Sequence, residues 1–264
     1  MYHLEKFYPP NFDPRAYWDA RYAQEHIAGK SADEFRKQGF WPLLEKNLTK
    51  DKRYLDAGCG VGGWVIFLDE EGYNVEGIDI AARIIRALTE YNRDLKVKVA
   101  EMTQIPYADA SFDGVLAIGV LEYVEGKVPI ALAETGRVLK PGGMLFLEVP
   151  MANALRRWVY LPLKKIEKLV KTTQGKQPTF ASYLFTHRSL MEQLSKAGFE
   201  IVEVRPHELP ESDSHYGLYI DWKILRGSQP YKLNILGRIV KAVANFLSPW
   251  IASTGMVVVA RKKL

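Results

Sequence analysis

A glycine-rich turn between a short apolar strand and a helical segment constrains the fold of this chain more than any other feature. A strand pattern at 53–56 ends in Asp56, seven residues rich in glycine follow at 57–63, and a helical run begins at Trp64. Glycine lets a backbone turn sharply and present free N–H groups to a ligand. A second strand pattern ends in another acid, Asp79. Such strand-turn-helix units are typical of an α/β protein that binds its ligand at the strand ends.

The same alternation continues along the chain and predicts a complete sheet. Short apolar strand patterns are separated by helical ones, and Thr186 is a candidate N-cap for a helix that stops before Gly198. The run 112–118 is nearly continuous in apolar residues, as in a parallel strand buried on both faces. We therefore predict an α/β fold with a doubly wound, mostly parallel sheet of seven strands. Its predicted strands are 53–56, 72–79, 97–100, 112–118, 144–149, 199–204 and 256–260, its helices include 81–92 and 130–139, and 141–143 is a turn.

The acids beside the turn restrict the class of ligand that can bind there. Gly58, Gly60 and Gly63 satisfy the G-x-G-x-x-G pattern of dinucleotide sites, so a dinucleotide-dependent oxidoreductase has to be considered. The carboxylate of Asp56, however, would repel a pyrophosphate and would suit a ligand that carries an ammonium and a sulfonium group. Asp79 is placed to accept hydrogen bonds from two ribose hydroxyls. A cationic nucleoside ligand is favoured; a non-catalytic partner subunit that binds this ligand is a further alternative.

In these residues the chain resembles the class I S-adenosylmethionine-dependent methyltransferases, a Rossmann-like family. Within it, the chain is similar to the small-molecule group that includes the quinone-biosynthesis methyltransferases. The resemblance implies S-adenosylmethionine as cofactor and S-adenosylhomocysteine as product, and an antiparallel hairpin that closes the sheet. The segments that carry it, in order, are 55–62, 75–80, 100–107, 111–124 and 137–143.

The resemblance also implies which residues bind the cofactor. The first motif would hold the methionine part, the second the ribose, the third the adenine, and the segment after the fourth strand would lie beneath the cofactor. Glu101 stands where the family often has aspartate, and Cys59 is interpreted as a small loop residue rather than a nucleophile. The implied cofactor-binding residues are Tyr22, Asp56, Gly58, Cys59, Gly60, Asp79, Ile80, Glu101, Met102, Thr103, Ile118 and Gly119.

The segment 16–22 resembles the helical lid that precedes the first strand in these enzymes. Its aromatic residues Tyr17, Trp18 and Tyr22 could line the cofactor, because an aromatic face attracts a sulfonium, or could pack as ordinary helix residues. We expect one methyltransferase domain over 1–264. Its predicted parts are an N-terminal helical lid at 1–45, a cofactor-binding core at 50–150 and substrate-cap inserts at 151–180 and 206–254.

Methyl transfer from a sulfonium is an in-line displacement, so the main task is to align donor and acceptor in a dry pocket. A hydroxyl acceptor would benefit from a general base. His215 is the first candidate and His207 the second, since both lie in the second insert. Glu122 and Tyr123 face the expected mouth of the site or start a helix. No metal site is predicted, because a single cysteine makes a cysteine-based zinc site implausible.

The net charge of +5 is unevenly distributed. Residues 1–150 carry −5, 151–176 carry +6, 177–221 carry −4 and 222–264 carry +8. Basic amphipathic patterns at 151–171, with a break predicted at Pro162, and at 235–247 have two interpretations. They form interfacial helices that dock on anionic lipid and admit an amphiphilic acceptor, or a cap whose apolar stripes pack on the domain. Nucleic acid is disfavoured as a partner, because few aromatic residues are interleaved with the cations.

Cysteine content and hydropathy bear on location. The lone Cys59 excludes an internal disulfide and fits a reducing cytoplasm. The first fifteen residues lack the apolar segment of a secretory signal. The uncharged run 242–260 is interrupted by polar residues and a proline, so we interpret it as a helix end, a turn and a strand rather than a membrane span. The expected location is cytoplasmic, with peripheral contact at the inner membrane surface and a small or lipid-linked acceptor.

Overall fold

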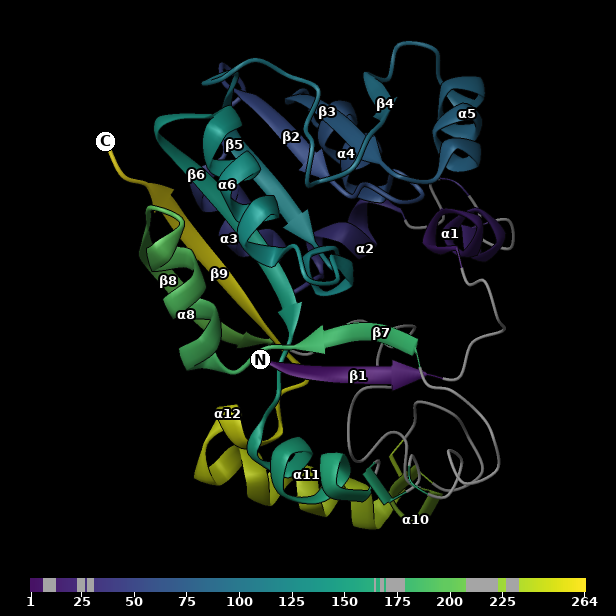
Figure 1. Cartoon of the computed structure of the whole chain (residues 1–264), viewed down its shortest axis with the longest axis vertical. Coiled ribbons are helices and arrows are strands. Elements are labelled where there is room, and N and C mark those ends of the chain that lie inside the picture. Colours follow the sequence, from purple (N-terminus) through teal and green to yellow (C-terminus); the bar gives the residue numbers. More distant parts are fainter. Residues whose placement is uncertain are drawn as a thin grey trace. The chain divides into compact units, whose positions relative to one another are not determined.

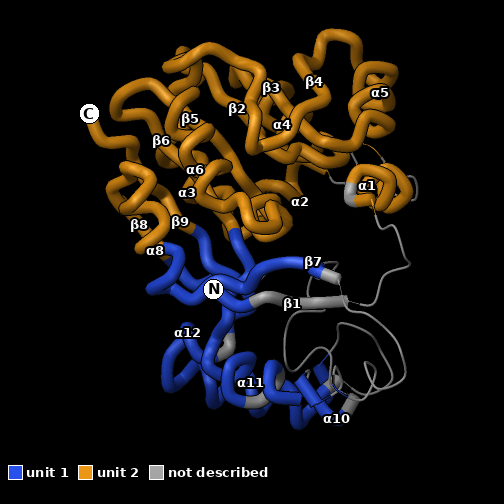
Figure 2. Tube along the Cα trace, viewed as in Figure 1, with its two compact units in different colours: residues 1–8, 149–190, 205–257 blue, residues 9–148, 191–204, 258–264 orange. Residues whose placement is uncertain are grey.

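The computed structural model describes residues 1–6, 13–22, 27, 31–163, 165–166, 169, 179–207, 223–226 and 233–264. The chain divides into two compact units, shown in two colours in Figure 2. Both predicted inserts fall within unit 1, and the prediction of a single domain with a cap stays a prediction. Unit 1 comprises Met1–Tyr8, Val149–Leu190 and Arg205–Val257, and unit 2 comprises Pro9–Glu148, Met191–Val204 and Val258–Leu264.

The main sheet has the predicted seven strands, and their order is β4-β3-β2-β5-β6-β9-β8 (Figure 1). The strands β2 to β6 pair in parallel, and β9 runs in the opposite direction. The strands of this sheet are β2 Arg53–Ala57, β3 Asn74–Asp79, β4 Val97–Val99, β5 Phe112–Ile118, β6 Leu139–Pro150, β8 Phe199–His207 and β9 Gly255–Lys262.

The centre of the sheet forms a continuous apolar core. Side chains of the central strands, such as Leu55, Val115 and Phe146, have no exposed surface. Parallel strands are covered on both faces by their crossover helices, which explains these unbroken apolar runs. Figure 1 shows α6 on the near face of the sheet and α3 on the far face. The helices of unit 2 are α1 Pro14–Tyr22, α2 Ala32–Arg36, α3 Trp41–Asn47, α4 Gly63–Glu70, α5 Ala82–Tyr91, α6 Val128–Val138 and the 3₁₀ turn η1 Leu121–Tyr123.

An aromatic cluster attaches the N-terminal helices to the glycine turn. Phe35 of α2 stacks on Phe67 of α4 with ring centroids 5.1 Å apart, and it meets Trp64 edge-on at 4.9 Å. Trp41 of α3 meets Phe67 at 4.9 Å. Such aromatic pairs stabilise beyond the area they bury. The cluster therefore fixes α4, and with it the turn that precedes α4.

Two local predictions differ from the structure. The predicted turn at 141–143 lies inside β6, where the register shifts so that Phe112 pairs with Leu139 but Gly114 with Met144. The chain turns locally within the strand, where Gly142 after Pro141 has φ of +76°. The helical pattern also continues through Pro162 instead of breaking there. The chain widens into a π-helical turn just before this proline, and the amide of Leu161 donates to the carbonyl of Arg156 five residues back.

Unit 1 combines a small sheet with helices. Strand β1 pairs antiparallel with β7, a sheet that the sequence patterns did not predict. Thr186 caps the following helix as predicted, since its Oγ1 accepts a hydrogen bond from the amide of Ser189 at 3.0 Å. No helix in the described part of the chain is long and apolar enough to cross a membrane. Besides the ends of β6, β8 and β9, the elements containing residues of unit 1 are β1 Tyr2–Lys6, the π turn η2 Arg156–Tyr160, β7 Thr179–Leu184, α8 His187–Lys196, α10 Lys223–Arg226, α11 Ile235–Leu247 and α12 Pro249–Ala252.

Candidate active site

The glycine turn is attached to the end of the neighbouring strand. The amides of Gly58 and Cys59 both donate to the carbonyl of Ile78, at 2.8 and 2.9 Å. The carboxylate of Asp79 accepts one hydrogen bond from the amide of Gly60 and one from that of Ala81, each at 2.9 Å. Asp79 therefore organises the turn itself, a role that sequence reasoning missed.

Asp79 still has acceptor capacity for a ligand. Each carboxylate oxygen has about two lone-pair positions, so each can accept a second hydrogen bond. The side chain is 6% exposed, and burial raises its pKa although the backbone amides that donate to it counteract the shift. A buried carboxylate that is already oriented by two backbone amides suits a pair of vicinal hydroxyls.

Two glycines of the turn allow a close approach to the surrounding chain. Gly60 has φ of +52°, and a Cβ there would lie 3.0 Å from the hydroxyl of Tyr22. Gly58 has φ of +95°, and a Cβ would lie 2.5 Å from a methyl group of Val120. Both positions favour glycine for backbone and steric reasons. The structure thus brings together the predicted residues Tyr22, Gly58 and Gly60.

Asp56 is a buried acid whose charge is unbalanced. It is 2% exposed, and no described residue donates a hydrogen bond to its carboxylate. Burial, with the nearby charge of Asp79, raises the pKa of Asp56 to about 7. An unpaired buried carboxylate is destabilising unless a ligand supplies a counter-charge. The donor set at this turn therefore fits a cationic ligand.

The lid helix α1 contacts the core through one face. Arg15 forms an ion pair with Glu101, and Asp19 accepts from the amide of Arg83 at 2.9 Å. Trp18 meets Tyr123 edge-on, with ring centroids 4.9 Å apart. Arg15, Trp18, Asp19 and Tyr22 follow the i, i+3, i+4, i+7 spacing of a single helix face. That spacing was the signal from which Arg15 and Asp19 could have been found.

The predicted adenine segment is partly occupied by its own contacts. Glu101 accepts from Thr103 Oγ1 at 3.1 Å through one carboxylate oxygen, while Arg15 binds the other. The Arg15 guanidinium is the main cause of the lowered pKa of Glu101. Met102 is buried, with 4% of its surface exposed. Glu101 is therefore held in a fixed orientation just after the end of β4.

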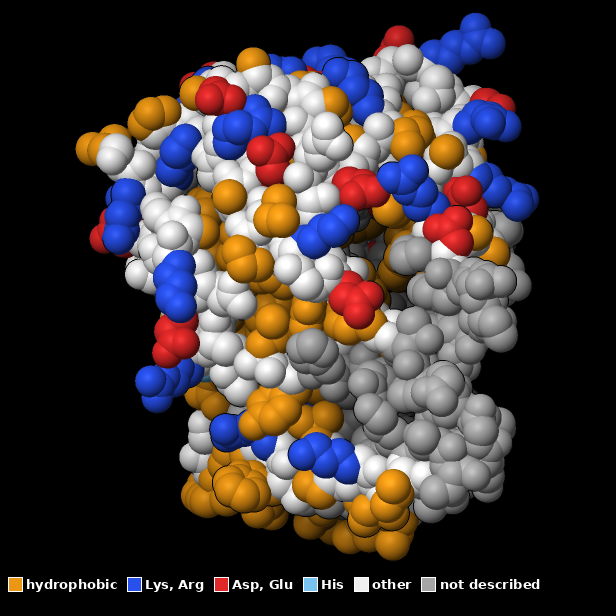
Figure 3. Space-filling view, in the orientation of Figure 1, with side chains coloured by type: hydrophobic (Ala, Val, Ile, Leu, Met, Phe, Trp, Pro, Cys, Tyr) orange, Lys and Arg blue, Asp and Glu red, His pale blue; other side chains and the backbone are white. Residues whose placement is uncertain are grey.

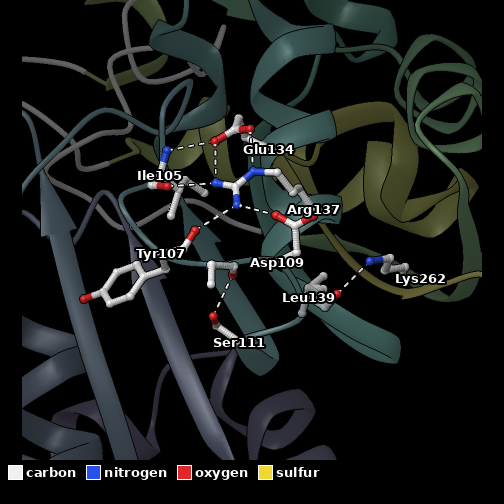
Figure 4. A network of polar contacts seen from close by, with 9 residues as sticks. Ile105, Tyr107, Asp109, Ser111, Glu134, Arg137, Leu139 and Lys262 are labelled. Carbon is white, nitrogen blue, oxygen red and sulfur yellow. Dashed lines mark hydrogen bonds and ion pairs between the residues drawn. The ribbon is translucent and has the colours of Figure 1, made fainter.

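A second arginine, Arg137, binds the backbone of the predicted adenine segment (Figure 4). Arg137 on α6 donates to the carbonyls of Ile105 and Tyr107, both at 2.8 Å. It also forms ion pairs with Glu134 and Asp109, and Glu134 accepts from the amide of Ile105. Such a network fixes a loop that has no strand partners of its own.

The end of β5 lies beside the turn. Gly119 follows Ile118, and its amide donates to the carbonyl of Glu148 at 3.1 Å. Glu122, in the turn η1, is 6% exposed, and its Oε1 lies 3.8 Å from where a Cβ of Gly119 would be. Contact between Val120 and Gly58 places this segment against the glycine turn. The strand ends of β2, β3 and β5 therefore converge on one site, which also contains Ile80 directly after Asp79.

The structure does not test the two predicted general bases. His215 lies outside the described residues. His207 is the last residue of β8 and belongs to unit 1, whereas the glycine turn belongs to unit 2. Cys59 is buried, and burial raises the pKa of its thiol well above its ordinary value, which keeps the thiol protonated. The catalytic roles of both histidines stay predictions.

Comparison with known proteins decides the family. A family model described as a methyltransferase domain matches residues 21–204, more than half of the chain. The demethylmenaquinone methyltransferase of Geobacillus kaustophilus is 30% identical over 209 residues, which cover 71% of this chain and 88% of that protein. This chain belongs to the S-adenosylmethionine-dependent methyltransferases. Its cofactor is S-adenosylmethionine, as the resemblance implied, and the family does not favour the oxidoreductase alternative.

Two further comparisons agree with this assignment. The 2-methyl-6-phytyl-1,4-hydroquinone methyltransferase of Synechocystis is 31% identical, over 54% of this methyltransferase and 45% of that protein. A solved S-adenosylmethionine-dependent methyltransferase from Methanosarcina mazei superposes with a TM-score of 0.61 at 23% identity. That superposition covers 84% of this methyltransferase and 98% of the solved chain, and it confirms the Rossmann-like fold.

Proposed function

We propose that this methyltransferase transfers a methyl group to an amphiphilic small molecule of the quinol type. The match to demethylmenaquinone methyltransferase over 88% of that relative's length carries the proposal. The hydroquinone methyltransferase of Synechocystis supports the same acceptor class, since its named substrate combines a hydroquinone ring with a phytyl chain. A non-catalytic partner subunit is not favoured, because the turn and the acids beside it are all present.

The methyltransferase residues at the glycine turn are assigned to cofactor binding. S-adenosylmethionine supplies an electrophilic methyl group on a sulfonium. We assign Asp56 to its positive charge and Asp79 to its ribose hydroxyls, because one carboxylate lacks a counter-charge and the other is oriented by two amides. Glu101 is assigned to the adenine amine. The aromatic faces of Trp18 and Tyr22, which stack 5.4 Å apart, exclude water on the lid side.

Acceptor chemistry requires alignment and a proton acceptor. An in-line displacement gains most from positioning the two reactants in a water-free pocket. A phenolic or enolic carbon acceptor, or a hydroxyl, reacts faster when a base removes its proton. His207 and His215 are the proposed bases. Glu122 is a third, because this buried carboxylate lies beside Gly119 at the end of β5.

Methyl transfer with labelled S-adenosylmethionine tests the acceptor class. Purified protein is incubated with a prenylated hydroquinone, with a tail-less hydroquinone and with total lipid extract. We expect label to appear in the prenylated hydroquinone and in a lipid fraction of similar polarity. Label found solely in water-soluble metabolites would refute the quinol proposal and leave the cofactor assignment intact.

A further inference from the structure

Helix α11 in unit 1 turns its large apolar side chains outward. Six of the thirteen residues of this helix are bulky hydrophobic residues with about half or more of their surface exposed. Phe246 is 90% exposed and Ile239 is 54% exposed. A surface helix ordinarily buries its apolar side chains, so this helix has the reverse orientation. The exposed residues are Ile235, Leu236, Ile239, Val243, Phe246 and Leu247.

Close contacts on the opposite side fix this orientation. The helix buries its small residues Gly237 and Ala244, with Ala244 in a cluster with Leu225. A Cβ at Gly237 would lie 2.2 Å from the carbonyl oxygen of Leu225, so a larger residue cannot face inward here. The Asn234 side chain caps the helix by accepting from the amide of Gly237 at 2.8 Å. Rotation that would bury Phe246 would break both arrangements.

A neighbouring segment extends the apolar surface. Leu155 packs against the same cluster that buries Ala244, so the helical segment 154–163 lies beside α11. Trp158 on this segment is 78% exposed. Figure 3 shows hydrophobic side chains gathered on this part of unit 1. We use the name apolar face for the six exposed residues of α11 together with Trp158, Leu163, Ile166 and Leu169.

Cations accompany the apolar face. Arg157, Lys165 and Arg238 are exposed on the segments that form it. Among the described residues of 149–190 and 205–257 there is no aspartate or glutamate, and residues 223–264 contain none in the sequence. Exposed apolar side chains flanked by Lys and Arg are typical of a surface that enters the interface of an anionic bilayer. A second copy of this chain would instead bring like charges together.

We propose that the apolar face of unit 1 docks on the surface of an anionic phospholipid membrane. Phe246, Ile239 and Trp158 enter the interfacial layer while Arg157 and Arg238 contact lipid phosphates. The proposal concerns the partner of this surface, and it stands whether or not the acceptor is a quinol. It takes up the lipid interpretation of the basic inserts, because the large apolar side chains of α11 and Trp158 are exposed.

Vesicle sedimentation at low salt tests the proposal with the full chain. Vesicles of phosphatidylcholine alone are compared with vesicles that also contain phosphatidylglycerol. The test variant replaces Ile239 and Phe246 by serine (I239S/F246S), and the matched control is Ile130→Ser on α6, a residue with 51% exposure in unit 2. A second variant reverses charge (R157E/R238E). Melting curves with S-adenosylhomocysteine verify that every variant is folded.

We expect strong binding of the wild type to anionic vesicles and at least tenfold weaker binding to neutral ones. Both double variants should lose at least tenfold in affinity for anionic vesicles, and Ile130→Ser should bind like the wild type. Absence of binding by the wild type, or undiminished binding by folded I239S/F246S, overturns the proposal. So does a wild-type dimer that I239S/F246S converts to a monomer without any vesicle binding, because the occupant would then be a second copy.

Discussion

The two units of this methyltransferase depart from ordinary burial in opposite ways. Unit 2 buries acids at the glycine turn, with Asp56 2% and Asp79 6% exposed. Unit 1 exposes hydrocarbon, with Phe246 90% and Trp158 78% exposed. Folded proteins usually bury apolar side chains and leave acids in water, and departures tend to mark functional sites. We therefore propose that each unit presents a surface completed by a binding partner, the cationic cofactor for unit 2 and an anionic lipid surface for unit 1.

The largest expected effect concerns the buried acids at the glycine turn of unit 2. Asp79→Ala should weaken binding of S-adenosylhomocysteine about 100-fold, because charge-assisted hydrogen bonds to the ribose are lost and the turn loses its anchor at Gly60. Isothermal titration calorimetry measures the affinity. Asp69→Ala, an exposed acid on α4, is the control. An unchanged affinity in Asp79→Ala would show that the ribose assignment is wrong.

The second-largest expected effect concerns the side of α11 that packs against Leu225. Gly237→Ala should lower the free energy of unfolding by about 2 kcal/mol, since the new Cβ meets a backbone oxygen that cannot move without shifting the helix. Urea unfolding followed by circular dichroism measures this. A neutral substitution would mean that α11 is not seated on Leu225 as described.

Asp56 makes cofactor binding depend on pH. Its carboxyl is about half protonated at pH 7, so S-adenosylmethionine, whose charge favours the carboxylate, should displace about half a proton on binding. Binding therefore tightens as pH rises through 7. Calorimetry in buffers of different ionisation enthalpy counts the proton, and Asp56→Asn should abolish its release. Proton uptake on binding would contradict the assignment.

The same raised pKa has a consequence for stability. The folded state holds the Asp56 proton between pH 4 and 7 more tightly than the unfolded state does. The cofactor-free protein should consequently lose stability as pH rises through this window, and Asp56→Asn should reduce that loss. An Asp56→Asn variant with the wild-type pH profile would show that another group controls it.

The smallest expected effect is on the exposed side of α11. Phe246→Ala should change the free energy of unfolding by less than about 0.5 kcal/mol, because a side chain already in water loses little when truncated. Comparison with Gly237→Ala under the same conditions sharpens the contrast between the two sides of the helix. A cost of several kcal/mol would mean that Phe246 is packed in solution.

The sequence predicted the sheet and the position of Asp56 and Asp79 beside the glycine turn, for physical reasons. Apolar runs such as 112–118 and the glycine turn are local signals that only a few backbone arrangements satisfy. The lid contacts of Arg15 and Asp19 were missed because a charge on a short helix is ordinarily solvated. Strand β6 begins at Leu139, before the predicted turn at 141–143, because Pro-Gly-Gly indicates a turn but not that a strand continues through it.

The orientation of α11 was the least predictable feature. Its periodicity correctly predicted a helix at 235–247, but the usual rule places the apolar stripe inward. The contacts that reverse it involve Leu225, ten or more residues away, and the close approach allowed by Gly237. Such a contact depends on tertiary structure that no local pattern encodes.

Measuring both affinities on the same two variants tests the division of roles between the units most directly. Binding of S-adenosylhomocysteine and of anionic vesicles is determined for Asp79→Ala and for I239S/F246S. We predict that Asp79→Ala loses the nucleoside and keeps the vesicles, and that I239S/F246S does the reverse. Loss of both ligands by either folded variant would contradict the account.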